Sequence, residues 1–179
     1  MLPKYIGICG HPKSGKDLVG KMLTEYGHYH KIDNGGILRQ AAPAIFGFDP
    51  AYGYSQEGKL RMVNSPSGPR TVRDLLGSLG NALEHTFGEE VMGWSAIKAA
   101  ERAEATEGAT HFVMTSCRKE EGRVYKRNGG IVIQVDRPGV GPSGHDFDLW
   151  NPDYVDHVIV NDGTIPDLEK KIIDFLRLF

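Results

Sequence analysis

The chain has 179 residues, of which 40% are hydrophobic and 25% charged, and this composition is typical of one soluble globular domain with a sizeable core. Its formal net charge of −2 argues against a polymeric nucleic acid partner, because there is no basic excess to neutralise phosphates, whereas small nucleotides are allowed as ligands. The sequence shows no signal peptide and no apolar stretch that could span a membrane, so we expect no membrane partner.

The two cysteines, Cys9 and Cys117, lie in or next to apolar runs and do not form a disulfide framework. Neither has a CxxC partner, and the histidines lack the spacing of a metal site. Buried free thiols fit a reducing compartment, so the sequence predicts a cytoplasmic protein.

The first predicted strand, residues 5–9, leads into the sequence GHPKSGKD at residues 10–17 and then into a helix at residues 16–26. The run fits the phosphate-binding template G-x-x-x-x-G-K-[ST] at every position except the last. Glycines let backbone N–H groups point at phosphate oxygens, the helix N-terminus adds positive potential, and Lys16 can reach the outer phosphates of a nucleoside triphosphate. The predicted nucleotide-binding residues here are Gly10, Lys13, Ser14, Gly15, Lys16 and Asp17.

Asp17 stands where the template has a Ser or Thr whose hydroxyl ligates magnesium. A carboxylate can also hold this hard cation, directly or through water, so Asp17 is the predicted Mg²⁺ ligand. An acidic residue in the first turn of a helix is also favoured by the helix dipole, and the two roles are compatible.

The later elements alternate between strands and helices. In chain order we expect a strand at 28–33, a helix at 37–46, a helix capped by Thr71, a helix at 90–106, a strand at 111–115, a helix at 119–128, strands at 131–135 and 157–160, and a helix at 166–178. This alternation predicts a doubly wound parallel sheet with right-handed crossovers, in a single domain that spans residues 1–179.

Two segments have a different composition. Residues 49–69 are rich in Gly, Pro, Ser and Tyr, and we interpret them as a mobile surface loop on the acceptor side. Residues 137–152 are dense in Gly, Pro and Asp and contain the sequence HDFD at 145–148, so they are interpreted as a lid-like segment.

Four further motifs follow the Gly-Lys-Asp loop. They are Leu38-Arg39-Gln40-Ala41-Ala42 with Phe46-Gly47; Arg73-Asp74-Leu75-Leu76 with Leu79-Gly80; Arg118 with Gly129-Gly130 and Arg137-Pro138-Gly139; and Asn161-Asp162-Gly163-Thr164. Their order resembles that of phage-type deoxynucleoside monophosphate kinases over nearly the whole chain. The resemblance implies an α/β, three-layer P-loop kinase fold with a five-stranded parallel sheet. It also implies that the protein transfers the γ-phosphate of ATP to a deoxynucleoside monophosphate (dNMP) to give the diphosphate (dNDP), with Mg²⁺ as cofactor. If the protein is viral, the reaction takes place in the cytoplasm of the host cell.

Phosphoryl transfer requires cations that hold both nucleotides in line and neutralise the transferring group. The predicted catalytic residues are therefore Lys16, Arg39, Arg73 and Arg118, which the resemblance places at phosphate contacts. A guanidinium suits this role because its planar fork can bind phosphate oxygens in a bidentate way. The resemblance further suggests that Arg127 and Arg137 contact the ATP base or belong to a lid.

The chain departs from the family pattern at several positions. Ser116 stands where an acidic residue commonly follows the central strand, and Gly77 and His85 replace a Gln and an Arg. Two alternatives therefore stay open: a kinase of another small phosphorylated acceptor such as phosphomevalonate, since animal-type phosphomevalonate kinases share the Gly-Lys-Asp loop, and a nucleotide-binding module without transfer activity. A homodimer is compatible with the sequence, which does not fix the oligomeric state.

Overall fold

The computed structural model describes residues 1–144 and 148–179, so His145, Asp146 and Phe147 of the lid-like segment lie outside the described residues. Residue contacts divide the chain into two compact units. The first unit comprises residues 1–34 and 93–179, and the second comprises residues 35–92. The expectation of a single domain over residues 1–179 stays a prediction.

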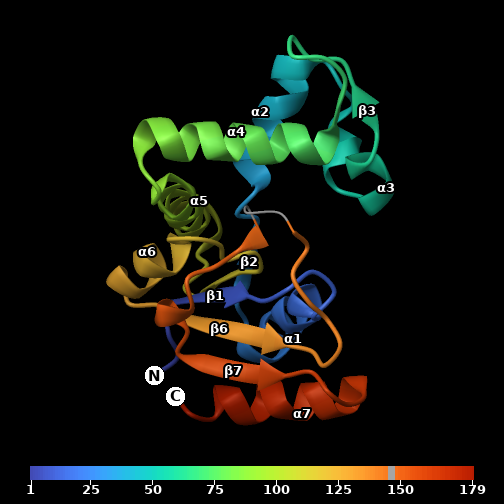
Figure 1. Cartoon of the computed structure of the whole chain (residues 1–179). Helices are drawn as coiled ribbons and strands as arrows, with labels where there is room; N and C mark the ends of the chain where they lie inside the picture. The colour runs from blue at the N-terminus through green and yellow to red at the C-terminus, as the bar shows by residue number, and fades with distance from the viewer. Residues whose placement is uncertain (145–147) are drawn as a thin grey trace. The chain divides into compact units, whose positions relative to one another are not determined.

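The first unit is built on a sheet of five parallel strands in the order β2-β5-β1-β6-β7 (Figure 1). The strands are β1 (Tyr5–Cys9), β2 (His30–Ile32), β5 (Phe112–Met114), β6 (Ile131–Asp136) and β7 (His157–Val160). The central strands β1 and β5 are buried along their whole length, as expected for strands covered on both faces. The predicted five-stranded parallel sheet is confirmed.

Helices cover both faces of this sheet and complete the three layers (Figure 1). Alternate residues of β1 point to opposite faces, as the pleat of a strand requires. Ile6 and Ile8 pack with α1 (Lys16–Gly27) and α7 (Ile165–Leu176). Tyr5 and Cys9 pack with α5 (Val91–Glu107) and α6 (Glu121–Arg127).

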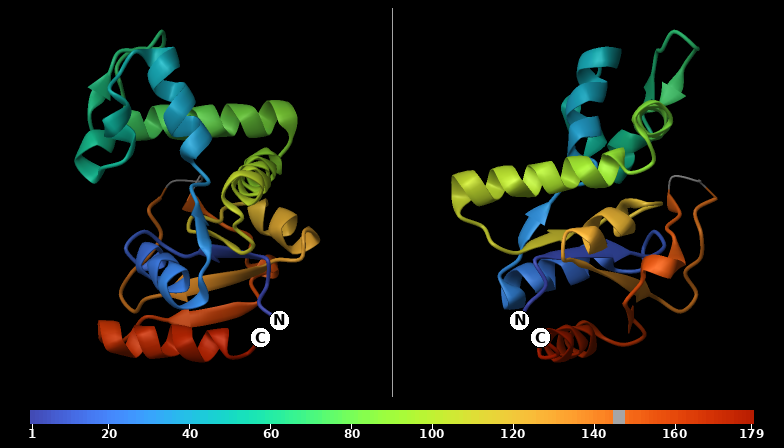
Figure 2. Two further views of the ribbon diagram at one scale, coloured as in Figure 1. Left: turned by 180° about the vertical axis from the view of Figure 1, so that it is seen from behind. Right: turned by 90° about the vertical axis from the view of Figure 1, so that its left-hand side faces the viewer.

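The two ends of the chain lie side by side in the first unit, as all views show (Figures 1 and 2). The Met1 amine donates a hydrogen bond to the carbonyl oxygen of Phe179. None of the helices in the described part of the chain is long and apolar enough to cross a bilayer.

The second unit has its own small core of Ala42, Phe48, Val72 and Leu75. Its elements are α2 (Gly36–Phe46), a 3₁₀ turn η1 (Pro50–Gly53), α3 (Gln56–Lys59), the hairpin strands β3 (Met62–Val63) and β4 (Arg70–Thr71), and α4 (Val72–Phe87). The predicted cap of α4 is present, because the Thr71 hydroxyl oxygen accepts a hydrogen bond from the Asp74 backbone N–H at 3.1 Å.

Residues 49–69 carry more regular structure than the sequence suggested. Asp49 and Ser55 cap η1 and α3 with their side chains, and Gly58 lies so close to the Tyr52 backbone that a Cβ would approach within 2.5 Å. Turn-forming residues here start short helices, which the composition alone did not distinguish from a loop. The mobility of this segment stays a prediction.

Several element boundaries also differ from expectation, and two of the differences have a clear cause in the backbone. The strand predicted at 28–33 covers only His30–Ile32, since His28 adopts a left-handed conformation (φ 56°) and its N–H bonds to the Leu23 carbonyl oxygen, which closes α1. The helix predicted at 119–128 begins at Glu121, after Lys119 with φ 39°. A positive φ is incompatible with a right-handed helix, so the helix starts later.

Candidate functional site

The phosphate loop, residues 10–16, follows the carboxyl end of β1 and leads directly into α1. Gly10 and Gly15 have φ of 138° and 105°, a backbone conformation that residues with a Cβ rarely adopt. A Cβ on Gly10 would also lie 2.3 Å from the Val135 carbonyl oxygen in the neighbouring strand β6. Both template glycines are therefore required by the backbone path that the loop takes.

Lys16, the first residue of α1, extends its side chain back across the loop. Its Nζ donates to the carbonyl oxygens of Gly10 at 2.7 Å and His11 at 2.9 Å. Partial burial lowers the pKa of the Lys16 amine, whereas the neighbouring Asp17 carboxylate acts in the opposite direction. An ammonium that has lost part of its hydration gains most from an anionic ligand, so this amine suits a phosphate oxygen.

Ser14 is buried inside the loop, with 1% of its surface exposed. Its Oγ has no hydrogen-bond partner among the described residues. The Ser14 carbonyl oxygen, in contrast, accepts a hydrogen bond at 2.8 Å from Nδ2 of Asn161, which follows β7. Lys13 is exposed at the turn of the loop, with φ 71°.

Asp17 projects into solvent from the first turn of α1, with 86% of its side chain exposed. Its Oδ1 lies 3.8 Å from Nζ of Lys31 on β2. Within residues 1–144 and 148–179, no group of three or more His, Cys, Asp or Glu side chains gathers as a metal cluster. One exposed carboxylate beside a phosphate loop fits a cation that takes its other ligands from nucleotide and water, so Mg²⁺ at Asp17 stays a prediction.

Arg118 follows β5 at the same edge of the sheet as the phosphate loop. Its Nη2 lies 3.3 Å from Oδ1 of Asp148, and the Ser143 hydroxyl donates to Oδ2 of Asp148 at 2.7 Å. The Asp148 and Arg118 charges both act on the pKa of Lys16, in opposite directions. Lys16, Arg118 and Asp148 therefore form one group of interacting charges.

A buried polar cluster lies between α6 and the end of β2. Glu121 is 4% exposed, and its Oε2 accepts hydrogen bonds from Asn34 Nδ2 at 2.7 Å and from the Tyr125 hydroxyl at 3.0 Å. Burial raises the pKa of the Glu121 carboxyl to about 7, and the nearby Arg118 charge opposes the shift. A buried acidic side chain therefore lies close to Arg118 and is hydrogen-bonded to protein partners.

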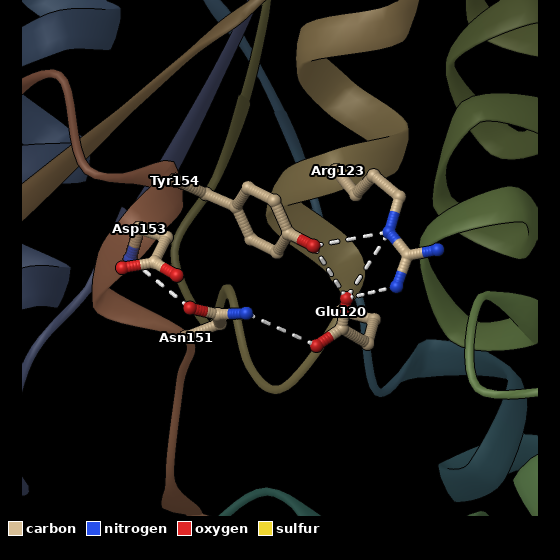
Figure 3. A network of polar contacts seen from close by, with 5 residues as sticks. All are labelled: Glu120, Arg123, Asn151, Asp153 and Tyr154. Atoms are coloured by element: carbon tan, nitrogen blue, oxygen red, sulfur yellow. Dashed lines mark hydrogen bonds and ion pairs between the residues drawn. The ribbon is translucent and has the colours of Figure 1, made fainter.

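A second polar network fixes the chain where the lid-like segment ends (Figure 3). Oε2 of Glu120 accepts hydrogen bonds from the Tyr154 hydroxyl at 2.6 Å and from the Arg123 guanidinium, and Oε1 accepts from Asn151 at 3.3 Å (Figure 3). The hydrogen bond from Tyr154 contributes most to lowering the pKa of Glu120. These contacts tie residues 151–154 to the start of α6.

Arg39 and Arg73 belong to the second unit, where each has partners of its own. Arg39 Nε donates to the Gly53 carbonyl oxygen at 3.1 Å, and its guanidinium lies 5.6 Å from the centre of the Tyr54 ring. Arg73 Nη2 donates to Oε1 of Gln56 at 3.0 Å. Both guanidinium groups are thus held by the segment that the sequence assigned to the acceptor side.

The two remaining predicted arginines lie at opposite edges of the sheet. Arg137 directly follows β6, so it lies at the carboxyl edge with the phosphate loop. Arg127 is the last residue of α6, shortly before β6 begins, and this position is at the amino edge. The structure therefore does not bring Arg127 to the loop, and its predicted contact with nucleotide has no support from this position.

Sequence analysis included Asn161 in a motif but gave it no role, and it did not mark Glu121 at all. The position of Asn161 directly after an apolar strand is a second signal, because strand ends meet at the ligand edge of a parallel sheet. Glu121 carried no signal, because a charged residue in the first turn of a helix is normally exposed.

No known protein family profile matches the sequence, and no curated protein matches it significantly. Several solved structures share the fold, among them the following two. TT1252 from Thermus thermophilus is 18% identical with a TM-score of 0.54, and the match covers 100% of this chain and 99% of that one. The dephospho-CoA kinase from Campylobacter jejuni is 14% identical with a TM-score of 0.50, covering 98% of this chain and 96% of that one. With its phosphate loop between β1 and α1, the chain has the fold of a P-loop kinase.

Proposed function

We propose that this protein is an ATP-dependent kinase of a small phosphorylated acceptor, and that the acceptor is a deoxynucleoside monophosphate. The observation that carries the proposal is the position of Lys16. Its amine is held by Gly10 and His11 across a loop whose glycines have the backbone conformation that phosphate binding requires. The fold shared with a dephospho-CoA kinase supports kinase chemistry in general, and the order of motifs along the sequence supports the dNMP acceptor.

The protein would promote phosphoryl transfer mainly by positioning the two substrates and by neutralising the charge on their phosphates. Backbone N–H groups of the phosphate loop bind the β-phosphate and γ-phosphate of ATP, and Lys16 stabilises the charge on the transferring group. Arg118 lies at the same edge of the sheet, and the planar fork of a guanidinium suits bidentate contact with phosphate. Bound Mg²⁺ would add further charge neutralisation, with Asp17 as its protein ligand.

Arg39 and Arg73 are proposed to bind the acceptor phosphate. Both guanidinium groups are attached to a helix and held by a second segment of the same unit, through Gly53 and Gln56 respectively. A side chain held in this way loses little conformational entropy on binding, which favours precise placement of an acceptor.

The test is to incubate the full chain with ATP, Mg²⁺ and one acceptor at a time and to measure ADP release. The acceptors are the deoxynucleoside monophosphates, the ribonucleoside monophosphates and phosphomevalonate. Lys16→Ala should lower kcat on the order of a hundredfold or more, because it removes a group that stabilises the transition state. Lys21→Ala is the matched control, since Lys21 lies on the same helix with 70% of its side chain exposed and pairs with Glu25.

Turnover with a deoxynucleoside monophosphate supports the full proposal. Turnover with phosphomevalonate alone would support the assignment as a kinase but identify a different acceptor. Tight ATP binding without turnover on any acceptor would show a nucleotide-binding module, and equal activity of Lys16→Ala and wild type would overturn the assignment of the loop.

A further inference from the structure

Asn161 connects the last strand of the sheet to the phosphate loop. It is the first residue after β7, and its backbone N–H donates to the Asp136 carbonyl oxygen at 2.6 Å, which continues the pairing of β6 with β7. Its side-chain Nδ2 donates to the Ser14 carbonyl oxygen at 2.8 Å, across 147 positions of sequence. The side chain is partly buried, so the hydrogen bond is partly shielded from competing water.

The Asn161 side-chain amide also explains why residue 15 must be a glycine. A Cβ on Gly15 would lie 2.6 Å from Nδ2 of Asn161, closer than van der Waals contact permits. Gly15 also has φ 105°, so the position excludes a side chain for two independent reasons. The second glycine of the template thus makes room for the Asn161 amide as well as for the turn.

The hydrogen bond from Asn161 fixes the orientation of one peptide group. In a trans peptide the C=O and N–H bonds point in opposite directions. Because the Ser14 carbonyl points at Asn161, the Gly15 N–H points away from Asn161. Backbone N–H groups of such a loop are the donors that bind phosphate.

We propose that Asn161 is a positioning residue for ATP, which holds the Ser14–Gly15 peptide so that the Gly15 N–H faces the phosphate. This inference rests on the proposed function, namely that residues 10–16 bind ATP. Asn161 acts through the loop backbone and touches no reacting atom.

The segment around Asn161 is itself held firmly. Lys171 Nζ donates to the Val160 carbonyl oxygen at 2.7 Å and pairs with Asp162 at 2.5 Å. Thr164 and Asp167 form a reciprocal capping box at the start of α7, with the Asp167 carboxylate accepting from the Thr164 N–H at 2.8 Å. A positioning side chain needs this kind of support from its own surroundings.

The experiment compares three variants of the full chain by calorimetric titration with MgATP, by KM values for ATP and acceptor, and by thermal unfolding. Asn161→Ala deletes the amide. Asn161→Asp keeps its size but places an acceptor against the Ser14 carbonyl oxygen. Asn128→Ala is the matched control, because Asn128 Nδ2 makes the same kind of bond, to the Val124 carbonyl oxygen at 2.8 Å, at the amino edge of the sheet.

Asn161→Ala should raise the Kd for MgATP about three- to tenfold, the range expected for loss of one hydrogen bond, and should leave the KM of the acceptor unchanged. Asn161→Asp should raise the Kd on the order of tenfold or more, since it adds repulsion to that loss. Asn128→Ala should lower the unfolding temperature without changing the Kd.

Wild-type Kd values for MgATP in both Asn161 variants would overturn the inference while the proposed function stands. An equal rise of the Kd in Asn128→Ala would also overturn it, because the effect would then be one of general stability. A wild-type protein that binds neither MgATP nor inorganic tripolyphosphate would overturn this inference and the proposed function together.

Discussion

The Arg118 guanidinium and the Asp148 carboxylate lie 3.3 Å apart at the edge of the sheet that carries the phosphate loop. Asp148 also raises the pKa of Lys16, so its negative charge acts on two of the cations proposed to bind phosphate. Under the proposed function, nucleotide phosphate and Asp148 compete for the same positive groups. Because of this competition, removal of the Asp148 charge is predicted to strengthen ATP binding.

Asp148→Asn should tighten the binding of ATP by about two- to fivefold at low ionic strength. The change removes both an ion pair with Arg118 and a charge that repels phosphate. Arg118 is 39% and Asp148 14% exposed, and ion pairs that are in part open to water contribute up to about 1 kcal/mol, which corresponds to about a fivefold change. Titration of nucleotide into wild type and variant measures the effect. The control is Asp153→Asn, which removes the same charge from a residue of the neighbouring 3₁₀ turn (Figure 3).

Weaker binding by Asp148→Asn would contradict the competition, because it would mean that Asp148 supports the site. An equal gain in Asp153→Asn would assign the effect to net charge alone. Raising the salt concentration should shrink the gain, since screening weakens interactions of charges near the surface.

The sheet and the phosphate loop could be predicted because their signals are local. A buried strand reads as an apolar run, and the loop needs Gly10, Gly15 and Lys16 at fixed spacing, whatever the rest of the chain does. Arg118 and Arg137 could be placed for a similar reason, because each comes shortly after a predicted strand and strand ends meet at one edge.

The partners of these residues could not be predicted, since they depend on which strands are neighbours. Asn161 reaches Ser14 because the ends of β6 and β7 lie next to the loop, and Glu121 reaches Asn34 because β2 borders β5. Arg127, whose nucleotide contact stays a prediction, shows the same limit. A position at the end of a helix does not tell which edge of the sheet the side chain reaches.

Glu121 should make the stability of the protein depend on pH. Its folded-state pKa of about 7 lies above the ordinary value of 4.5, so the unfolded chain releases this proton first as the pH rises. The contribution to stability is fully present below about pH 4.5 and is lost as the pH rises to about 7. The total loss is on the order of 3 kcal/mol.

Glu121→Gln should lack this loss, because an amide does not titrate and its oxygen can still accept from Asn34 and Tyr125. Urea unfolding of wild type and variant between pH 5 and pH 8 checks the prediction. The variant should gain stability relative to wild type across this window. A difference between the two proteins that does not change with pH would show that Glu121 titrates at its ordinary value in the folded chain.

Asp17→Asn should raise the Mg²⁺ concentration required for half-maximal turnover, because an amide oxygen is a weaker ligand for a hard cation than a carboxylate. The measurement is a Mg²⁺ titration at fixed ATP. Asp174→Asn, an exposed residue of α7 paired with Arg177, serves as the control for loss of one negative charge. Identical titrations for wild type and Asp17→Asn would leave Asp17 with only the helix-dipole role.

Replacement of Arg39, Arg73 or Arg118 by Lys should reduce kcat on the order of a hundredfold while changing nucleotide affinity much less. Two polyanions repel each other as they approach in-line geometry, and several cations must offset that repulsion at the transition state. Lys keeps the positive charge but loses the planar fork, so long-range attraction survives and bidentate placement of the phosphate does not.

Steady-state kinetics with a varied acceptor separate kcat from KM. Arg177→Lys is the control, because Arg177 is exposed directly after α7 and pairs with Asp174 at 3.0 Å. If two of the three site variants keep wild-type kcat, these arginines are not the phosphate-binding set, even where turnover depends on Lys16.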